Sequence, residues 1–133
     1  MEVRGGTETI LVAEDEPAVS YVVGRILEGA GYRVLTAEDG ASAVDLFRRE
    51  RASVSLLVLD SVMPHKSGAE VAVEVRALAP NVGIILSSGY SDALTEGPAA
   101  SEFDEVLPKP YEPDQLLRAI RAVLDARARV GSR

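Results

Sequence analysis

The stretch LLVLDSVMPHKSG, residues 56–68, gives the strongest indication of the fold. Four consecutive apolar residues, Leu56 to Leu59, lead directly into the carboxylate of Asp60. A continuous run of strand-forming apolar residues is typical of a strand that is covered on both faces, as in a parallel sheet with helices on each side. The sequence therefore predicts that Asp60 lies at the carboxyl end of a buried strand, where a charged group requires an explanation.

Strand-like and helix-like segments alternate along the whole chain. Short apolar segments predict strands at residues 9–13, 33–37, 54–60, 82–88 and 105–108. Apolar residues at helical spacing predict helices from Pro17, after Gly40, after the loop 61–68 and over 112–128. Such alternation favours a doubly wound α/β domain, in which a five-stranded parallel sheet carries helices on both faces.

The segment between the last two predicted strands departs from this regularity. Alternation predicts a fourth helix within residues 91–102, but Gly97 and Pro98 interrupt it. Proline removes a backbone donor and clashes with the preceding helical turn. We therefore expect this fourth helix to be short or disordered.

Composition argues against several classes of function. The chain has 133 residues and no cysteine, and its 21 acidic and 14 basic residues give a formal net charge of -7. Disulfides and thiolate metal sites are therefore excluded, and direct binding to nucleic acid or anionic lipid is disfavoured. Apolar runs are far shorter than the roughly 20 residues that span a bilayer, so no membrane segment or signal peptide is predicted.

These features predict one cytoplasmic domain. We place it at residues 9–127, with an N-terminal extension at 1–8 and a C-terminal tail at 128–133.

Polar residues follow four of the five predicted strands. In an open parallel sheet of this kind, the functional crevice lies beyond the carboxyl ends of the strands. The polar residues at these ends are Glu14, Asp15, Glu16, Asp60, Ser87, Ser88 and Lys109. We therefore expect the loops after the first, third, fourth and fifth strands to form the site.

The chemistry of these residues suits phosphoryl transfer. Three carboxylates in one crevice repel one another unless a cation is bound, and Mg²⁺ prefers oxygen ligands of this kind. The hydroxyl of Ser88 and the ammonium of Lys109 supply a donor and a positive charge for phosphoryl oxygens. An aspartate can itself be the nucleophile towards phosphorus, and Asp60 is placed for that role.

Four segments together resemble the signature segments of the response-regulator receiver domain, the phosphoacceptor module of two-component signalling. They are ILVAEDEP (10–17), LLVLDSVMPHKSG (56–68), IILSSGYSD (84–92) and LPKPYEPDQLLRAI (107–120). The resemblance implies a flavodoxin-like sheet of order 2-1-3-4-5. It also implies that the domain accepts a phosphoryl group from a sensor histidine kinase or a histidine phosphotransfer domain.

The resemblance assigns a role to each part of the site. Asp60 matches the phosphorylated aspartate, and Glu14, Asp15, Asp60 and the backbone carbonyl of Val62 match the ligands of Mg²⁺ or Mn²⁺. A domain of this kind catalyses its own phosphorylation and dephosphorylation and is not a turnover enzyme. It is expected to signal to a downstream protein partner, as a monomer or a weak dimer.

The remaining positions concern the response to phosphorylation. Ser88 matches the residue that binds a phosphoryl oxygen, and Lys109 matches the lysine that pairs with it. The bond between Lys109 and Pro110 matches a position that is usually cis. Val106 stands where receivers commonly carry a tyrosine or phenylalanine whose ring changes position on activation.

Three other aromatic residues, Tyr90, Phe103 and Tyr111, are candidates to replace that ring.

Two alternative functions stay open. The chain also resembles receivers fused behind the ATPase domain of a hybrid histidine kinase. A nucleotide- or flavin-binding module on the same fold is disfavoured, because EDEP (14–17) stands where a glycine-rich phosphate loop would follow the first strand.

Overall fold

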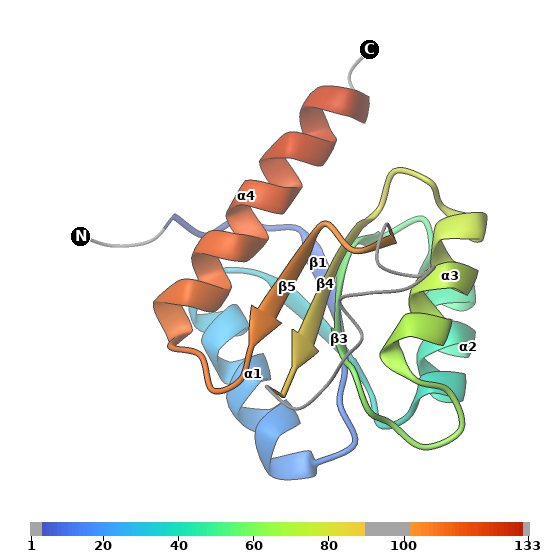
Figure 1. The fold of residues 1–133 in the computed structure, drawn as a ribbon. Helices are drawn as coiled ribbons and strands as arrows, with labels where there is room; N and C mark the ends of the chain where they lie inside the picture. The colour runs from blue at the N-terminus through green and yellow to red at the C-terminus, as the bar shows by residue number, and fades with distance from the viewer. Residues whose placement is uncertain (1–3, 90–101, 132–133) are drawn as a thin grey trace.

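The structure is a computed structural model that describes residues 4–89 and 102–131 (Figure 1). Its sheet contains five parallel strands in the order β2-β1-β3-β4-β5. The strands are β1 (Thr9–Ala13), β2 (Arg33–Ala37), β3 (Val54–Asp60), β4 (Gly83–Ser88) and β5 (Glu105–Pro108). This order confirms the predicted flavodoxin-like fold.

Four helices are described: α1 (Pro17–Gly29), α2 (Gly40–Glu50), α3 (Gly68–Leu78) and α4 (Pro113–Gly131). The helix predicted within residues 91–102 falls almost entirely on residues 90–101, which lie outside the described part of the chain. None of the helices in residues 4–89 and 102–131 is long and apolar enough to cross a membrane.

The helices form two layers around the sheet (Figure 1). Successive residues of a strand point to opposite faces. In β3, Leu57 and Leu59 therefore pack towards α2 and α3, whereas Leu56 and Val58 pack towards α1 and α4. The apolar run before Asp60 thus places side chains in both cores, the one beneath α2 and α3 and the one beneath α1 and α4, as expected of a strand that is buried on two faces.

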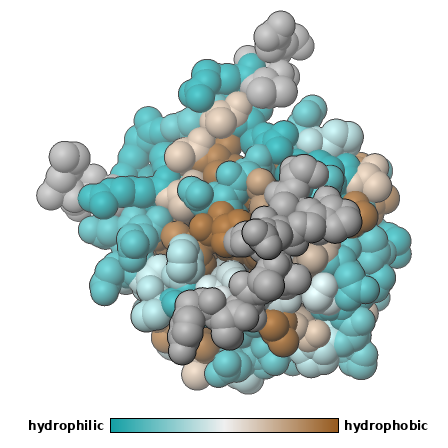
Figure 2. Space-filling model, viewed as in Figure 1, coloured by the Kyte–Doolittle hydropathy of each residue, from teal (hydrophilic) through white to brown (hydrophobic). Residues whose placement is uncertain are grey.

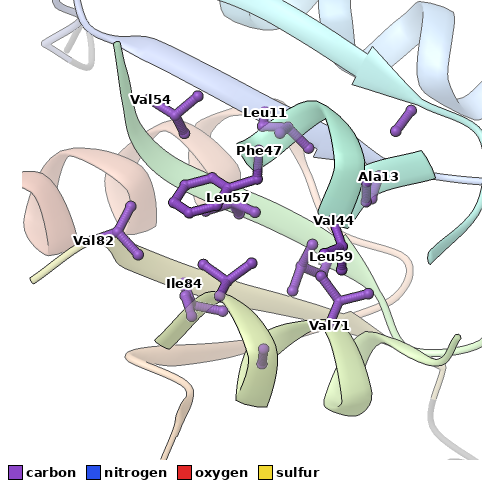
Figure 3. Packing of buried hydrophobic residues seen from close by; sticks show 14 of the residues in the cluster. Leu11, Ala13, Val44, Phe47, Val54, Leu57, Leu59, Val71, Val82 and Ile84 are labelled. Carbon is purple, nitrogen blue, oxygen red and sulfur yellow. The ribbon is translucent and has the colours of Figure 1, made fainter. Parts of the chain in front are cut away.

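Phe47 of α2 is the largest side chain in the core beneath α2 and α3, and it is fully buried. Its ring lies over Leu57, close to Leu11 and Val54 (Figure 3). On the outer surface, hydrophilic residues cover much of α4 and the side formed by α2 and α3 (Figure 2). The helices are thus amphipathic, as the apolar periodicity predicted.

Local sequence signals set the helix ends. The Asp39 side chain accepts a hydrogen bond from the Ser42 backbone N–H at 2.7 Å and so caps α2. Ser67 and Glu70 form a capping box at the start of α3. Gly31, with φ of +101°, allows the chain to turn from α1 into β2.

Residues 4–8 pack against the domain. Arg121 of α4 donates hydrogen bonds to both carboxylate oxygens of Glu8, at 3.1 and 2.7 Å, and to the carbonyl oxygen of Gly5 at 3.2 Å. The backbone N–H of Gly6 donates to the carbonyl oxygen of Ala30 at 3.2 Å. The extension is therefore attached to α4 and to the turn after α1, while the domain boundaries themselves stay a prediction.

Candidate functional site

The register of the strands brings charged residues to one side of the sheet. Val12, Val58 and Leu107 lie in the core beneath α1 and α4. Residues two positions further along a strand point to the same side. The charged residues at these positions are Glu14, Asp60 and Lys109.

Lys109 forms an ion pair with both carboxylates. Its Nζ lies 2.9 Å from Oδ1 of Asp60 and 3.4 Å from Oε1 of Glu14. Burial alone lowers the pKa of Lys109, but the hydrogen bonds and charges of Asp60 and Glu14 outweigh burial and raise that pKa overall. The side chain therefore carries a positive charge at neutral pH.

Glu14 is in an unfavourable place for an ionised carboxylate. Burial raises the pKa of Glu14, and the nearby charge of Asp60 adds to the rise. The Glu16 backbone N–H, which donates to Oε2 at 3.2 Å, and Lys109 oppose this rise without cancelling it. One lysine is thus not sufficient to neutralise the carboxylates gathered here, and a further cation would relieve the conflict.

Asp15 completes an acidic cluster with Glu14 and Asp60. One carboxylate oxygen from each residue lies within 4.8 Å of the other two. Ligands on opposite sides of an octahedral Mg²⁺ ion are about 4.2 Å apart, because each Mg–O distance is about 2.1 Å. A small inward movement would therefore let the three side chains hold a hard divalent ion. Val62, which is 63% exposed, lies in the loop two residues after Asp60, and the role of its backbone carbonyl as a metal ligand stays a prediction.

The loop after β3 fixes the backbone of Asp60. Ser61 donates its N–H to the carbonyl oxygen of Ser87 at 3.0 Å, and Gly68 donates its N–H to the carbonyl oxygen of Ser61 at 3.1 Å. A Cβ atom at Gly68 would lie only 2.4 Å from the carbonyl oxygen of Asp60. Glycine is therefore required for α3 to begin this close to the end of β3.

Ser88 and Lys109 meet through the backbone, because the Lys109 N–H donates to the carbonyl oxygen of Ser88 at 2.8 Å. The Ser88 side chain is buried, and its hydroxyl donates to the carbonyl oxygen of Gly89 at 3.2 Å. The bond between Lys109 and Pro110 is cis. The role of Ser88 as a phosphoryl ligand stays a prediction.

The candidate aromatic residues lie on different sides of the sheet. Val106 pairs with Leu86 and packs, with Phe103, against the core beneath α2 and α3. Tyr111 packs against the core beneath α1 and α4, the side that carries Asp60. Tyr90 lies outside the described residues. Of the aromatic candidates that the structure describes, Tyr111 is therefore the one on the side of the charged site.

Sequence reasoning did not assign a role to Ser87. Its side chain points to the same side of the sheet as Asp60, because the two residues pair in register across β3 and β4. The sequence does indicate this placement, because Ser87 lies two positions after Ile85, whose side chain is in the core on the same side of the sheet.

Comparisons with known proteins agree with this geometry. A family model of the response regulator receiver domain matches residues 10–121. The sensor kinase CckA of Brucella abortus is 34% identical over 122 residues, which are 90% of this chain and 13% of the kinase. The probable transcriptional regulatory protein TcrX of Mycobacterium tuberculosis is 32% identical over 90% of this chain and 51% of the regulator. The chain thus spans about half of that regulator and a small part of the kinase.

Solved structures give the same result. A response regulator receiver domain protein from Clostridium thermocellum matches with a TM-score of 0.87 and 27% identity, over 92% of this chain and 98% of that one. The response regulator TrrA from Thermotoga maritima, solved in complex with Mg(2+)-BeF, matches with a TM-score of 0.78 and 30% identity, over 88% and 99%. The family model covers most of the chain, and the fold and the acidic cluster accord with it. The chain therefore belongs to the response regulator receiver domain family of two-component systems.

Proposed function

We propose that Asp60 accepts a phosphoryl group from the phosphohistidine of a sensor histidine kinase or a histidine phosphotransfer domain. The observation that carries this proposal is the setting of Asp60: its buried carboxylate lies 2.9 Å from the Lys109 ammonium and within the cluster formed with Glu14 and Asp15. A buried carboxylate held between a cation and two further carboxylates is unusual for a purely structural residue.

In the proposed transfer, a carboxylate oxygen of Asp60 forms a bond to phosphorus. The bond between phosphorus and the donor imidazole nitrogen breaks, and its electron pair stays on the imidazole, which takes up a proton. Lys109 is placed to move from the carboxylate oxygen of Asp60 to an oxygen of the arriving phosphoryl group. The Ser88 hydroxyl would exchange the carbonyl oxygen of Gly89 for a second phosphoryl oxygen.

Glu14, Asp15, Asp60 and the carbonyl of Val62 would hold Mg²⁺ or Mn²⁺. When bound, such an ion neutralises negative charge on the phosphoryl oxygens and on the ligands themselves. The response regulator TrrA was solved in complex with Mg(2+)-BeF, and its similarity to this chain supports the assignment.

Hydrolysis would return the domain to its starting state. Water forms a bond to phosphorus, the bond to the Asp60 oxygen breaks, and its electron pair restores the carboxylate, while both protons of the water leave with the inorganic phosphate. The domain would thus catalyse its own dephosphorylation once per phosphoryl group received, without acting as a turnover enzyme on a separate substrate.

The partners follow from this chemistry. The phosphodonor would be a kinase or phosphotransfer protein, and the phosphorylated state would be recognised by a downstream protein. The similarity to a segment of the sensor kinase CckA favours, as a second arrangement, a receiver that forms part of a hybrid histidine kinase.

Phosphorylation of the purified chain by acetyl phosphate tests the proposal. With Mg²⁺ present, intact mass spectrometry should show one added phosphoryl group that is lost over time, and chelation of the metal should abolish its formation. Asp60→Asn should form no adduct. The matched control is Asp39→Asn, which changes another aspartate near a strand end, one that is occupied in capping α2.

A stable adduct, an adduct that survives Asp60→Asn, or the absence of any adduct would contradict the proposal. If Asp39→Asn also forms no adduct, the loss in Asp60→Asn is not specific to Asp60, and that variant no longer supports the proposal.

A further inference from the structure

Ser87 stands beside the phosphoacceptor in the sheet. Asp60 of β3, Ser87 of β4 and Leu107 of β5 are successive partners in register, so their side chains lie in one row on the same side. Neighbouring strands are about 4.8 Å apart. A serine hydroxyl in this row is therefore within reach of the Asp60 carboxyl group after a modest change of rotamer.

The Ser87 hydroxyl is in an unusual state. The residue is only 3% exposed, and among the described residues its Oγ is the buried side-chain atom that has no hydrogen-bond partner. A buried hydroxyl without a partner is unfavourable, whereas alanine or valine at this position would carry no such cost. The presence of a hydroxyl at this position is therefore explained if it gains a hydrogen-bond partner in another state of the site.

Tyr111 brings a second hydroxyl to the same place. Burial raises the pKa of the Tyr111 phenol, while the neighbouring Ser87 hydroxyl and the charge of Lys109 lower it; the charges of Glu14 and Asp60 raise it further. Tyr111 packs against the core on the side of the sheet that carries Ser87, and its phenol is protonated at neutral pH because burial raises the pKa. In this structure the two hydroxyls do not reach hydrogen-bonding geometry.

A change at Asp60 would alter this arrangement. Oδ1 of Asp60 now accepts a hydrogen bond from Lys109. Once Oδ2 of Asp60 carries a phosphoryl group and Lys109 turns to the phosphoryl oxygens, Oδ1 is left as a carbonyl oxygen that has lost the lysine. A carbonyl oxygen has two lone pairs, so it can accept a hydrogen bond even where it would also serve as a ligand of the proposed cation. Ser87, in the neighbouring strand of the same row, can donate to it.

We propose that Ser87 donates a hydrogen bond to the carbonyl oxygen of the aspartyl phosphate, and that Tyr111 is a positioning residue that donates to Ser87 Oγ and orients its proton. The inference rests on the proposed function of Asp60. It gives the pocket a pair of hydroxyls that set the lifetime of the phosphoryl group.

The direction of the effect follows from the charge that develops in hydrolysis. Water bonds to phosphorus and its protons leave with the inorganic phosphate, while the bond from phosphorus to the Asp60 oxygen breaks and the electron pair returns to the carboxyl group. Negative charge therefore grows on both carboxyl oxygens, and a donor to one of them stabilises the transition state more than the ground state. Removing the Ser87 proton should slow hydrolysis and lengthen the lifetime of the adduct.

The test measures the decay of the adduct by intact mass spectrometry after the phosphodonor has been removed. Ser87→Ala should lengthen the half-life about 2- to 10-fold, as expected for one hydrogen bond of ordinary net strength. Tyr111→Phe should lengthen it in the same direction. The double variant should match Ser87→Ala alone, because Tyr111 acts through Ser87. Ser87→Thr, which keeps the hydroxyl, should restore rapid decay.

Two further measurements separate this role from a structural one. Ser87→Ala should leave the thermal stability of the unphosphorylated chain unchanged or higher, because it removes an unpartnered hydroxyl. Beryllofluoride with Mg²⁺ should change the ultraviolet absorbance of tyrosine in the unmodified chain and in Tyr32→Phe, but not in Tyr111→Phe. Tyr32 is a suitable control because it is buried in the same core and lies 3.5 Å from Arg121.

The possible failures are distinguishable. If the unmodified chain forms no adduct, both the proposed function and this inference are overturned. If the adduct forms on Asp60 but decays equally fast in Ser87→Ala, the inference alone is overturned. Additive effects of the two substitutions, or a Ser87→Thr variant that decays as slowly as Ser87→Ala, would also overturn it.

Discussion

Lys109→Met removes the cation that the structure shows in contact with both Asp60 and Glu14. Methionine keeps a long flexible side chain of similar size, so the change removes the charge with little change in packing volume. Three carboxylates then remain within 4.8 Å of one another without their ion pair. We expect the metal-free domain to lose stability, and we expect Mg²⁺ to restore most of the loss.

The distances set the magnitude of this loss. At an effective dielectric constant of about 20, Coulomb's law gives about 6 kcal/mol for the contact with Asp60 and about 5 kcal/mol for that with Glu14. Desolvation of the charges offsets much of this attraction, and removing one partner of a buried ion pair typically costs about 3–5 kcal/mol. Because the Lys109 side chain is 30% exposed, we expect a smaller loss of about 2–3 kcal/mol.

Urea denaturation at neutral pH, with chelator or with Mg²⁺, measures both effects. In chelator, the free energy of unfolding of Lys109→Met should fall by about 2–3 kcal/mol, and the difference from the unmodified chain should shrink when Mg²⁺ is added. The matched control is Lys66→Met, which removes a lysine paired with Glu74 at a more exposed site. That loss should be below about 1 kcal/mol and independent of Mg²⁺.

Equal losses in the two lysine variants would refute the reasoning, because burial of the Asp60 site would then have no energetic consequence. A loss at Lys109 that Mg²⁺ does not reduce would refute the claim that the carboxylates hold a cation.

Other single changes test the charges and contacts around the site. Glu14→Gln removes a carboxyl group whose pKa is raised in the folded state. The protonated group stabilises the fold below pH 4.5, its usual pKa, and this contribution is lost as the pH rises above that value. Relative to the unmodified chain, the variant should therefore gain stability with rising pH in urea denaturation without Mg²⁺; a constant difference would contradict this. Gly68→Ala would place a methyl group 2.4 Å from the carbonyl oxygen of Asp60 and should lower the free energy of unfolding by about 1–3 kcal/mol, whereas Gly29→Ala, with nothing within 4 Å, should not. Arg121→Met should lower stability by about 1–2 kcal/mol at neutral pH and speed amide hydrogen exchange in residues 5–8. The loss of stability should shrink as pH falls below 4.5, because Arg121 lowers the pKa of Glu8 and their attraction ends when Glu8 is protonated. Unchanged amide hydrogen exchange in residues 5–8 would refute the attachment of these residues to α4.

Most of the fold could be predicted from apolar periodicity. Four strands have the predicted bounds, and β4 begins at Gly83 instead of residue 82. The last helix continues to Gly131, beyond the predicted end at residue 128. Helix ends are the hardest feature to predict, because alanine and arginine favour a helix even where no apolar residue marks its buried face.

The sequence predicted that Glu14, Asp15, Asp60 and Lys109 lie together, but it did not predict the contacts between their side chains. The strand order alone brings Glu14, Asp15, Asp60 and Lys109 to the same edge of the sheet. The sequence does not reveal that Lys109 contacts two carboxylates, because that depends on side-chain geometry. For the same reason, the attachment of Glu8 by Arg121 could not be predicted, since these residues are far apart in the chain.

The central claim is that the sheet presents Asp60 as the phosphoacceptor. Borohydride converts an aspartyl phosphate to homoserine, so reduction after treatment with acetyl phosphate and Mg²⁺, followed by peptide mapping, identifies the modified residue directly. We predict homoserine at position 60 and an unmodified Asp15. Homoserine at another aspartate, or none at all in a chain shown to be folded, would contradict the account.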